Sequence, residues 1–429
     1  MIIANSQAPC QPRYSGAVKE ENTTMELTFP LILDGATGTE LQKRGFSGEE
    51  AAEKWVLEHP EAIVEIQRAY LAAGSRVVYT PTFGANRVKL EAHGLFNSVA
   101  DYNIRLTALS REAAGDQALV AGDLAPTGLF LYPLGETTFE ELVEIYTEQA
   151  AALESAGVDL FVVETMMTVA EARAAVLAVR SVSTKPVFVS FTCDANGRTL
   201  TGSDVAAVLQ IMQGMQIDAF GLNCSVGPKE MIPQLRRLYE IARVPLIAKP
   251  NAGIPEIRGK ETVYDCPPEQ FTAHLREMAA AGVCIFGGCC GTTAEHVAAL
   301  KAGTADLIPA ALHPQHTELL PCATEKELFF LDPAVDVGEA LACGDDLEDE
   351  LEDALDSDAP VVSVAVRSSE DLDCFADCQY RISKPLCLHC DNADLLEQAL
   401  RLYQGRALYA GSLSEAELLP LVQKYGLLI

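Results

Sequence analysis

The strongest constraint on the fold is a regular alternation of short apolar runs with longer segments of helical spacing. Each run is uniformly apolar, which is typical of a strand that is buried on both faces. The eight runs cover residues 31–33, 76–79, 118–121, 160–163, 187–191, 219–222, 245–248 and 283–286. Residues 139–157 and 168–182 have helical spacing between two pairs of runs. This alternation predicts parallel strands that are joined by crossover helices.

Eight such units match the usual size of a closed barrel. They occupy about 270 residues, which is typical of a (β/α)₈ or TIM barrel. The competing fold, an open doubly wound sheet, usually carries a glycine-rich phosphate turn after its first strand. Residues 35–39 (GATGT) contain glycine at the wrong spacing for that turn. We therefore predict an α/β chain with a TIM barrel over residues 29–308.

The alternation is interrupted after the barrel. Residues 309–325 are rich in proline and histidine and are predicted to be a linker. Residues 326–429 contain further strand candidates and predict a smaller α/β domain with too few units to close a second barrel. Nine of the fourteen residues in 345–358 are acidic, with leucines at i, i+4 and i+8. This segment predicts a solvated helix whose leucines face inward.

Composition limits the partners and the compartment. The chain has 31 Lys and Arg against 61 Asp and Glu, a formal charge of −30 that disfavours nucleic acid and membrane surfaces. No apolar run reaches the roughly 20 residues of a membrane span. Residues 1–28 read as a disordered leader without a secretory signal, and Met25 is a candidate start codon. We expect a cytoplasmic protein.

The thirteen cysteines are an odd number, which argues against a simple disulfide framework. Cys224 ends the sixth predicted strand, and Cys289 and Cys290 end the eighth. The carboxyl ends of barrel strands share one rim, so these three sulfur atoms can converge. Three thiolates with one open position are typical of a catalytic zinc site, which ionises a bound thiol. A redox role for the vicinal pair and buried, inert thiols are the alternatives.

Other polar residues follow strands on the same rim. Asp34 and Glu164 are candidates to bind a substrate ammonium group, and the N–H groups of residues 35–37 could hold a carboxylate if they begin a helix. The alternative role for the two carboxylates is to cap the following helices. An amino acid that bears a thiol would satisfy the cysteines, the carboxylates and the N–H groups together.

Several strings resemble one family closely. They are LDGATGTELQKRG (33–45), TPTFGANR (80–87), AGDLAPTG (121–128), VVET (162–165), SFTCDANGRTLTG (190–202), GLNCSVGP (221–228), AKPNAGIP (248–255) and FGGCCGTT (286–293). They are similar to the homocysteine-binding barrel of cobalamin-dependent methionine synthases, which betaine– and S-methylmethionine–homocysteine methyltransferases share. The resemblance implies that Cys224, Cys289 and Cys290 are catalytic zinc ligands. It also implies that Asp34, Gly35, Ala36 and Glu164 surround the homocysteine backbone.

The C-terminal segment resembles, more weakly, half of the pterin-binding barrel that follows in methionine synthases. The similar strings are 330–345, 384–408 and 419–426. The chain departs from the family pattern at residues 389–391 (HCD) and 410–411 (AG), where the family has polar turns. This departure argues against binding of methyltetrahydrofolate. Residues 374–390 also contain four cysteines and His389, for which a second zinc site is a weaker interpretation than buried thiols.

These observations predict a zinc-dependent homocysteine S-methyltransferase that forms methionine when the zinc-bound thiolate attacks an activated methyl group. The expected donor is methylcobalamin carried by a separate corrinoid protein, because the strings favour methionine synthase. Betaine or S-methylmethionine is the alternative donor. A non-catalytic protein that binds homocysteine or zinc and docks a partner is the alternative class.

Overall fold

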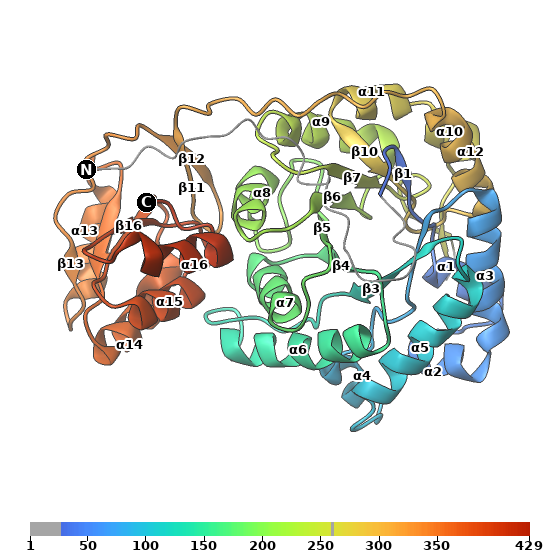
Figure 1. Ribbon diagram of the computed structural model, residues 1–429, viewed down its shortest axis with the longest axis horizontal. Coiled ribbons are helices and arrows are strands. Elements are labelled where there is room, and N and C mark those ends of the chain that lie inside the picture. Colours follow the sequence, from blue (N-terminus) through green and yellow to red (C-terminus); the bar gives the residue numbers. More distant parts are fainter. Residues whose placement is uncertain (1–26, 259–260) are drawn as a thin grey trace.

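The structure is a computed structural model that describes residues 27–258 and 261–429. Nearly all of the predicted leader, including Met25, lies outside these residues. The described part contains the predicted barrel and a smaller C-terminal α/β segment beside it (Figure 1). None of its helices is long and apolar enough to cross a membrane.

Eight parallel strands form the barrel, and each of them overlaps a predicted run. They are β1 (Leu31–Ile32), β2 (Val77–Tyr79), β3 (Leu119–Leu124), β4 (Leu160–Met166), β5 (Val187–Phe191), β6 (Ala219–Asn223), β7 (Leu246–Lys249) and β10 (Val283–Phe286). Their order is β1-β10-β7-β6-β5-β4-β3-β2. A backbone hydrogen bond of 2.8 Å from Arg76 N to Ile32 O joins the two ends of the sheet. The sheet is therefore nearly closed, and the predicted fold is confirmed.

Helices follow the strands and cover the outside of the barrel. They are α1 (Gly38–Lys43), α2 (Ala52–Glu58), α3 (Pro60–Ala73), α4 (Arg87–Ala92), α5 (Val99–Ala114), α6 (Phe139–Ser155), α7 (Val169–Val182), α8 (Val205–Gly214), α9 (Pro228–Tyr239), α10 (Pro268–Thr272), α11 (Leu275–Ala280) and α12 (Ala294–Thr304). The inner faces of the strands pack together in a separate apolar cluster that includes Leu33, Val162 and Ile247. Burial on both faces explains why the strands read as unbroken apolar runs.

One hairpin on the barrel was not predicted. It consists of β8 (Glu256–Arg258) and β9 (Glu261–Val263), which pair antiparallel between β7 and α10. The three residues of β8 are exposed, so the hairpin has no apolar pattern that a sequence could reveal.

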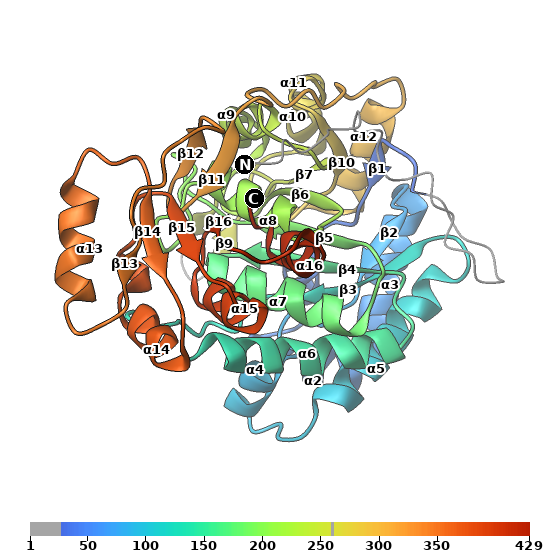
Figure 2. The same cartoon turned by 60° about the vertical axis from the view of Figure 1, so that its left-hand side comes forward.

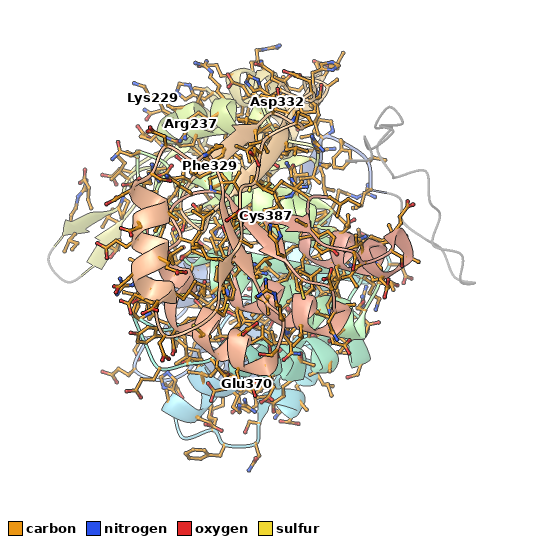
Figure 3. All side chains as sticks on the ribbon, turned by 90° about the vertical axis from the view of Figure 1, so that its left-hand side faces the viewer. Lys229, Arg237, Phe329, Asp332, Glu370 and Cys387 are labelled. Carbon is orange, nitrogen blue, oxygen red and sulfur yellow. The ribbon has the colours of Figure 1, made fainter. Side chains whose placement is uncertain are left out.

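The C-terminal segment contains a second parallel sheet, of four strands in the order β13-β14-β15-β16. Its elements are β13 (Leu341–Ala342), α13 (Leu347–Asp356), β14 (Val362–Ala365), α14 (Ser369–Cys378), the 3₁₀ helix η1 (Gln379–Arg381), β15 (Leu386–His389), α15 (Ala393–Leu402), β16 (Leu408–Ala410) and α16 (Glu415–Tyr425). The acidic run forms α13 as predicted, with Leu347 and Leu351 each 1% exposed. Figure 3 views this segment from outside, with Cys387 of β15 near its centre and Glu370 of α14 at its lower end.

The predicted linker is not wholly irregular. Its last residues form β11 (Leu320–Ala323), which pairs antiparallel with β12 (Leu328–Leu331). The strand was missed because it is short and contains Pro321, a residue that is confined to the edges of sheets. The boundaries predicted at residues 309–325 stay a prediction.

Buried polar contacts join the C-terminal segment to the barrel. Arg173 of α7 is 1% exposed, and its guanidinium donates to Gln404 Oε1 (2.7 Å) and to the carbonyl oxygen of Leu400 (2.6 Å). Arg406 donates to Gln210 Oε1 of α8 (3.3 Å). Figures 1 and 2 both show α15 and α16 beside α7 and α8. The segment is therefore packed onto the side of the barrel.

Candidate metal centre and substrate pocket

Three cysteines meet at the carboxyl ends of the barrel strands. Cys224 follows β6, and Cys289 and Cys290 follow β10. Their sulfur atoms all lie within 4.8 Å of one another. Across residues 27–258 and 261–429, no other group of three or more cysteine, histidine or carboxylate side chains has this spacing. The predicted convergence is confirmed, and the role of the sulfurs as zinc ligands stays a prediction.

The backbone on each side is bent to aim the sulfurs inward. Cys224 and Ser225 both adopt left-handed conformations, with φ of 62° and 58°, which few non-glycine residues do. Such conformations concentrate at functional sites. Gly291 has φ of 80°, and a Cβ there would lie 2.4 Å from Cβ of Tyr264. Only glycine fits this turn after the cysteine pair.

The three thiol groups cannot all ionise without help. Hydrogen bonds from Cys224 and Cys289 lower the pKa of Cys290 to about 3. The same contacts, together with burial, raise the pKa of Cys289 well above its ordinary value. The protein alone therefore stabilises one negative charge on the cluster. A divalent cation would stabilise the thiolate form of all three, and an all-sulfur donor set suits zinc.

Asn223 connects the sulfurs to the neighbouring strands. Its Nδ2 donates to Thr165 Oγ1 (2.7 Å) and lies 3.9 Å from Cys289 Sγ. Its Oδ1 accepts from Thr165 N (3.1 Å) and Ser190 Oγ (2.9 Å). Sequence reasoning missed this residue, although an asparagine directly before Cys224 at a strand end was the available signal.

A buried lysine lies between the two predicted carboxylates, at the end of β7. The side chain of Lys249 is 4% exposed, and its Nζ lies 3.2 Å from Asp34 Oδ1 and 3.4 Å from Glu164 Oε2. Nζ also lies 3.6 Å from the ring centroid of Tyr79. Burial alone would lower the pKa of Lys249, but the attraction of Glu164, Tyr79 and Asp34 outweighs it and raises that pKa. Sequence reasoning missed Lys249 because it ended the seventh apolar run at Ala248.

The two carboxylates predicted to bind an ammonium group differ in how many of their oxygen atoms already have a partner. Asp34 is 2% exposed, and its Oδ2 accepts a hydrogen bond from Tyr79 N at 2.8 Å while Oδ1 faces Lys249. The side chain of Glu164 is 13% exposed, and only its Oε2 faces Lys249. Neither carboxylate caps the helix that follows it, since the N-cap residues are Thr37 for α1 and Thr168 for α7. Glu164 is therefore the one with room for a substrate.

Glu164 lies at an irregular end of β4, two residues after the inward-facing Val162. The register of β4 with β5 shifts between Val163 and Met166. Thr165 within this shift has φ of 57°, which is unusual for a β-branched residue. Bulges next to active sites commonly redirect a side chain. Asn223, which bonds both the N–H and the hydroxyl of Thr165, holds this conformation in place.

The loop after β1 already makes hydrogen bonds and close contacts within the protein that the prediction did not include. Helix α1 begins at Gly38, three residues after Gly35. Ala36 N already donates to Thr292 Oγ1 (3.0 Å), and Ala36 O accepts from the Tyr70 hydroxyl (2.6 Å). A Cβ at Gly35 would lie 2.7 Å from the ring of Tyr70. The contact of Gly35 and Ala36 with a substrate carboxylate stays a prediction.

The C-terminal cysteines do not form a second metal site in the part of the chain that the structure describes. Cys374, Cys378 and Cys390 instead donate to the backbone carbonyls of Gly344, Cys374 and Asn392. A separate cavity of about 410 Å³ lies where β14, β15 and β16 end. Its lining includes residues 389–391 and 410–411, where the sequence departs from the pterin-binding pattern.

Comparisons with known proteins agree with this geometry. The family model for homocysteine S-methyltransferases matches residues 31–303. Methionine synthase of Mycobacterium leprae is 34% identical over 293 residues, which are 64% of this chain and 24% of the relative. Methionine synthase of Mycobacterium tuberculosis is 33% identical over 295 residues, which are 65% of this chain and 25% of the relative. The chain thus spans about a quarter of the length of these relatives.

Solved structures are similar over the same region. The homocysteine methyltransferase MmuM from Escherichia coli, in its metallated form, has a TM-score of 0.55 and 27% identity. The alignment covers 63% of this chain and 95% of that chain. The oxidized form of the same protein has a TM-score of 0.54 and 26% identity. The family model places the shared domain at residues 31–303, which is the barrel.

Proposed function

Because the chain belongs to the homocysteine S-methyltransferase family, we propose that it transfers a methyl group to the thiol of homocysteine and so forms methionine. The convergence of three sulfurs within 4.8 Å at the rim of the barrel is the observation that carries the proposal. A protein that served only as a scaffold for a partner would have no evident need for three converging thiols.

Cys224, Cys289 and Cys290 are the residues that would hold zinc. Their donor set fits this ion, because three thiolates leave one of four tetrahedral positions open. A bound zinc ion would keep the thiol of homocysteine ionised near neutral pH, where a free thiol with a pKa of about 8.5 is mostly protonated. In the reaction, a carbon–sulfur bond forms at homocysteine and the bond between methyl and its donor breaks.

The chain's own residues would orient the substrate. Glu164 would receive the ammonium group, and Asp34, whose Oδ1 lies 3.2 Å from Lys249 Nζ, would hold that lysine beside Glu164. The loop of Gly35 and Ala36 is the proposed neighbour of the carboxylate group. Positioning of this kind brings the thiol and the incoming methyl group into line, which is a large source of rate enhancement in transfer reactions.

We propose methylcobalamin on a separate corrinoid protein as the donor, because the sequence strings and the mycobacterial relatives favour methionine synthase. A small activated methyl donor such as S-methylmethionine or betaine is the second candidate. It is supported by the resemblance of the barrel strings to betaine– and S-methylmethionine–homocysteine methyltransferases, and MmuM, a homocysteine methyltransferase, aligns with this chain over 95% of its own length. We also propose that the C-terminal segment is related to the pterin-binding barrel of methionine synthases. The compartment that we propose is the reducing cytoplasm, which keeps the thiols free.

An assay of the zinc-loaded protein with homocysteine and each donor tests the proposal. We expect methionine to form with methylcobalamin, with the corrinoid protein enhancing the rate. Turnover with S-methylmethionine or betaine alone would replace the proposed donor. No methionine with any donor, from a sample that binds zinc and homocysteine, would contradict methyl transfer itself.

A further inference from the structure

The C-terminal segment has a cavity of its own, of about 410 Å³, at the edge of its sheet where β14, β15 and β16 end. In open sheets of parallel strands, ligands bind outside the carboxyl ends of the strands. A volume of this size lies within the range of small-molecule pockets. One face of the sheet is already covered, because Cys387 and Leu408 share an apolar cluster with the β11–β12 hairpin. The cavity at the strand ends is therefore not an uncovered core of the sheet.

Small side chains leave this space open. Ala340, Ala365 and Ala410 line the cavity, and Val366 adds an apolar surface. Gly411 lines it as well, and a Cβ there would lie 2.4 Å from the carbonyl oxygen of the preceding loop's cysteine, so a side chain at this position would require the backbone to shift. The apolar body of a small molecule would fit against these residues.

The polar residues of the lining offer hydrogen-bond donors. Arg367 follows β14, and its guanidinium forms no hydrogen bond or ion pair with another residue of 27–258 or 261–429. His389 ends β15, and its Nε2 is buried without a hydrogen-bond partner within the same ranges. Burial lowers the pKa of His389, so its ring is mostly neutral at neutral pH and Nε2 can carry the ring proton. A buried polar atom without a partner is costly, and a bound acceptor would supply that partner.

The charges around the cavity favour an anion with a single charge. Helices α14 and α15 begin at Ser369 and Ala393, shortly after the strand ends, so the positive ends of both helix dipoles lie at this edge. Arg367 can hold a carboxylate through two parallel hydrogen bonds. Asp391 also lines the cavity, and its Oδ1 accepts from Ser412 N (2.7 Å) and Ser412 Oγ (2.8 Å). This fixed carboxylate would repel a dianion more strongly than a monoanion.

We propose that the cavity binds a small organic monocarboxylate, with Arg367 paired to its carboxylate, His389 Nε2 donating to the same group, and the alanines and Val366 in contact with its apolar body. The site lies on the C-terminal segment and does not depend on methyl transfer at the cysteine cluster. The departures from the pterin-binding pattern at residues 389–391 and 410–411 then reflect a different ligand and not simply a lost one.

Binding of benzoate to the full chain, followed by NMR of the histidine rings, tests the proposal. Benzamide has nearly the same shape without the charge, and phenyl phosphate is a dianion above neutral pH. We expect benzoate at millimolar concentration to shift the Nε2 signal of His389, which is assigned by its loss in His389→Gln. Benzoate should bind roughly tenfold or more tightly than benzamide, as for a hydrogen bond to a charged group. Tighter binding of phenyl phosphate or methyltetrahydrofolate, or no binding of benzoate, would overturn the proposal.

Arg367→Met tests the pairing with the carboxylate directly. Because Arg367 has no ion pair to lose, the variant should fold like the wild-type protein. We expect its affinity for benzoate to fall roughly tenfold or more and its affinity for benzamide to stay the same. Arg381→Met, which removes an exposed arginine that pairs with Glu348 in the same segment, is the matched control. Equal loss of benzoate binding in the two variants, or no loss in Arg367→Met, would contradict the assignment.

Discussion

Arg173 joins the barrel to the C-terminal segment through contacts that only a buried guanidinium can make. Its two hydrogen bonds reach Gln404 Oε1 and the carbonyl oxygen of Leu400, and its guanidinium carbon lies 5.3 Å from the ring centroid of Phe139. In Arg173→Met, the methionine side chain fills most of the volume of the arginine. It has no N–H group, so both oxygens lose their hydrogen-bond donor. Each buried acceptor without a partner costs about 1–3 kcal/mol. The variant also avoids the free-energy cost of burying a charged guanidinium group, which offsets part of this loss.

We expect Arg173→Met to lower the free energy of unfolding by about 2–4 kcal/mol. Urea unfolding followed by circular dichroism measures this value. The control is Glu327→Gln, which removes an exposed ion pair with Arg198 across the same boundary and should cost about 0.2–1 kcal/mol. Equal, small losses in the two variants would show that the C-terminal segment does not depend on this buried contact, and the account of the interface would be wrong.

Two further variants test the site and its electrostatics. Asn223→Ala removes the amide beside Cys289 and should lower zinc affinity about 10–100-fold in a chelator competition, as loss of outer-shell partners does; unchanged affinity would exclude this role. Burial raises the pKa of Glu53 above the ordinary 4.5, so the folded protein keeps a proton that the unfolded chain releases. The stability of the wild-type protein should therefore fall as pH rises above the ordinary pKa of 4.5, so the stability of Glu53→Gln relative to wild type should increase between pH 4 and pH 7. Chemical unfolding measures it, with exposed Glu58→Gln as the control, and a margin independent of pH would contradict it.

The barrel could be predicted from the sequence because parallel strands that are covered on both sides leave a plain apolar signature. The meeting of Cys224 with Cys289 and Cys290 followed from counting strands, since every strand end lies on one rim. The inward leucines of α13 followed from helical spacing alone. These features depend on local pattern and on the geometry common to all such barrels.

Other features depend on contacts that no local pattern encodes. Lys249 lies 215 residues from Asp34 in the chain, and its role appears only when the strands close around it. The occupation of Ala36 N by Thr292 likewise joins distant segments. The bulge at Glu164 and Thr165 interrupts an apolar run without a glycine or proline to mark it. The strand β8 is exposed and β11 contains Pro321, whereas β12 is an apolar run (LFFL) that sequence reasoning did not use.

We propose that three cysteine sulfurs hold zinc and leave one position for the thiol of homocysteine. X-ray absorption at the zinc edge, recorded on the zinc-loaded protein before and after addition of homocysteine, measures the atoms around the metal directly. We expect three sulfur neighbours before addition and four afterwards, and loss of zinc when Cys224, Cys289 and Cys290 are replaced by serine. Zinc that stays bound in the serine variant, or a coordination shell that homocysteine leaves unchanged, would contradict it.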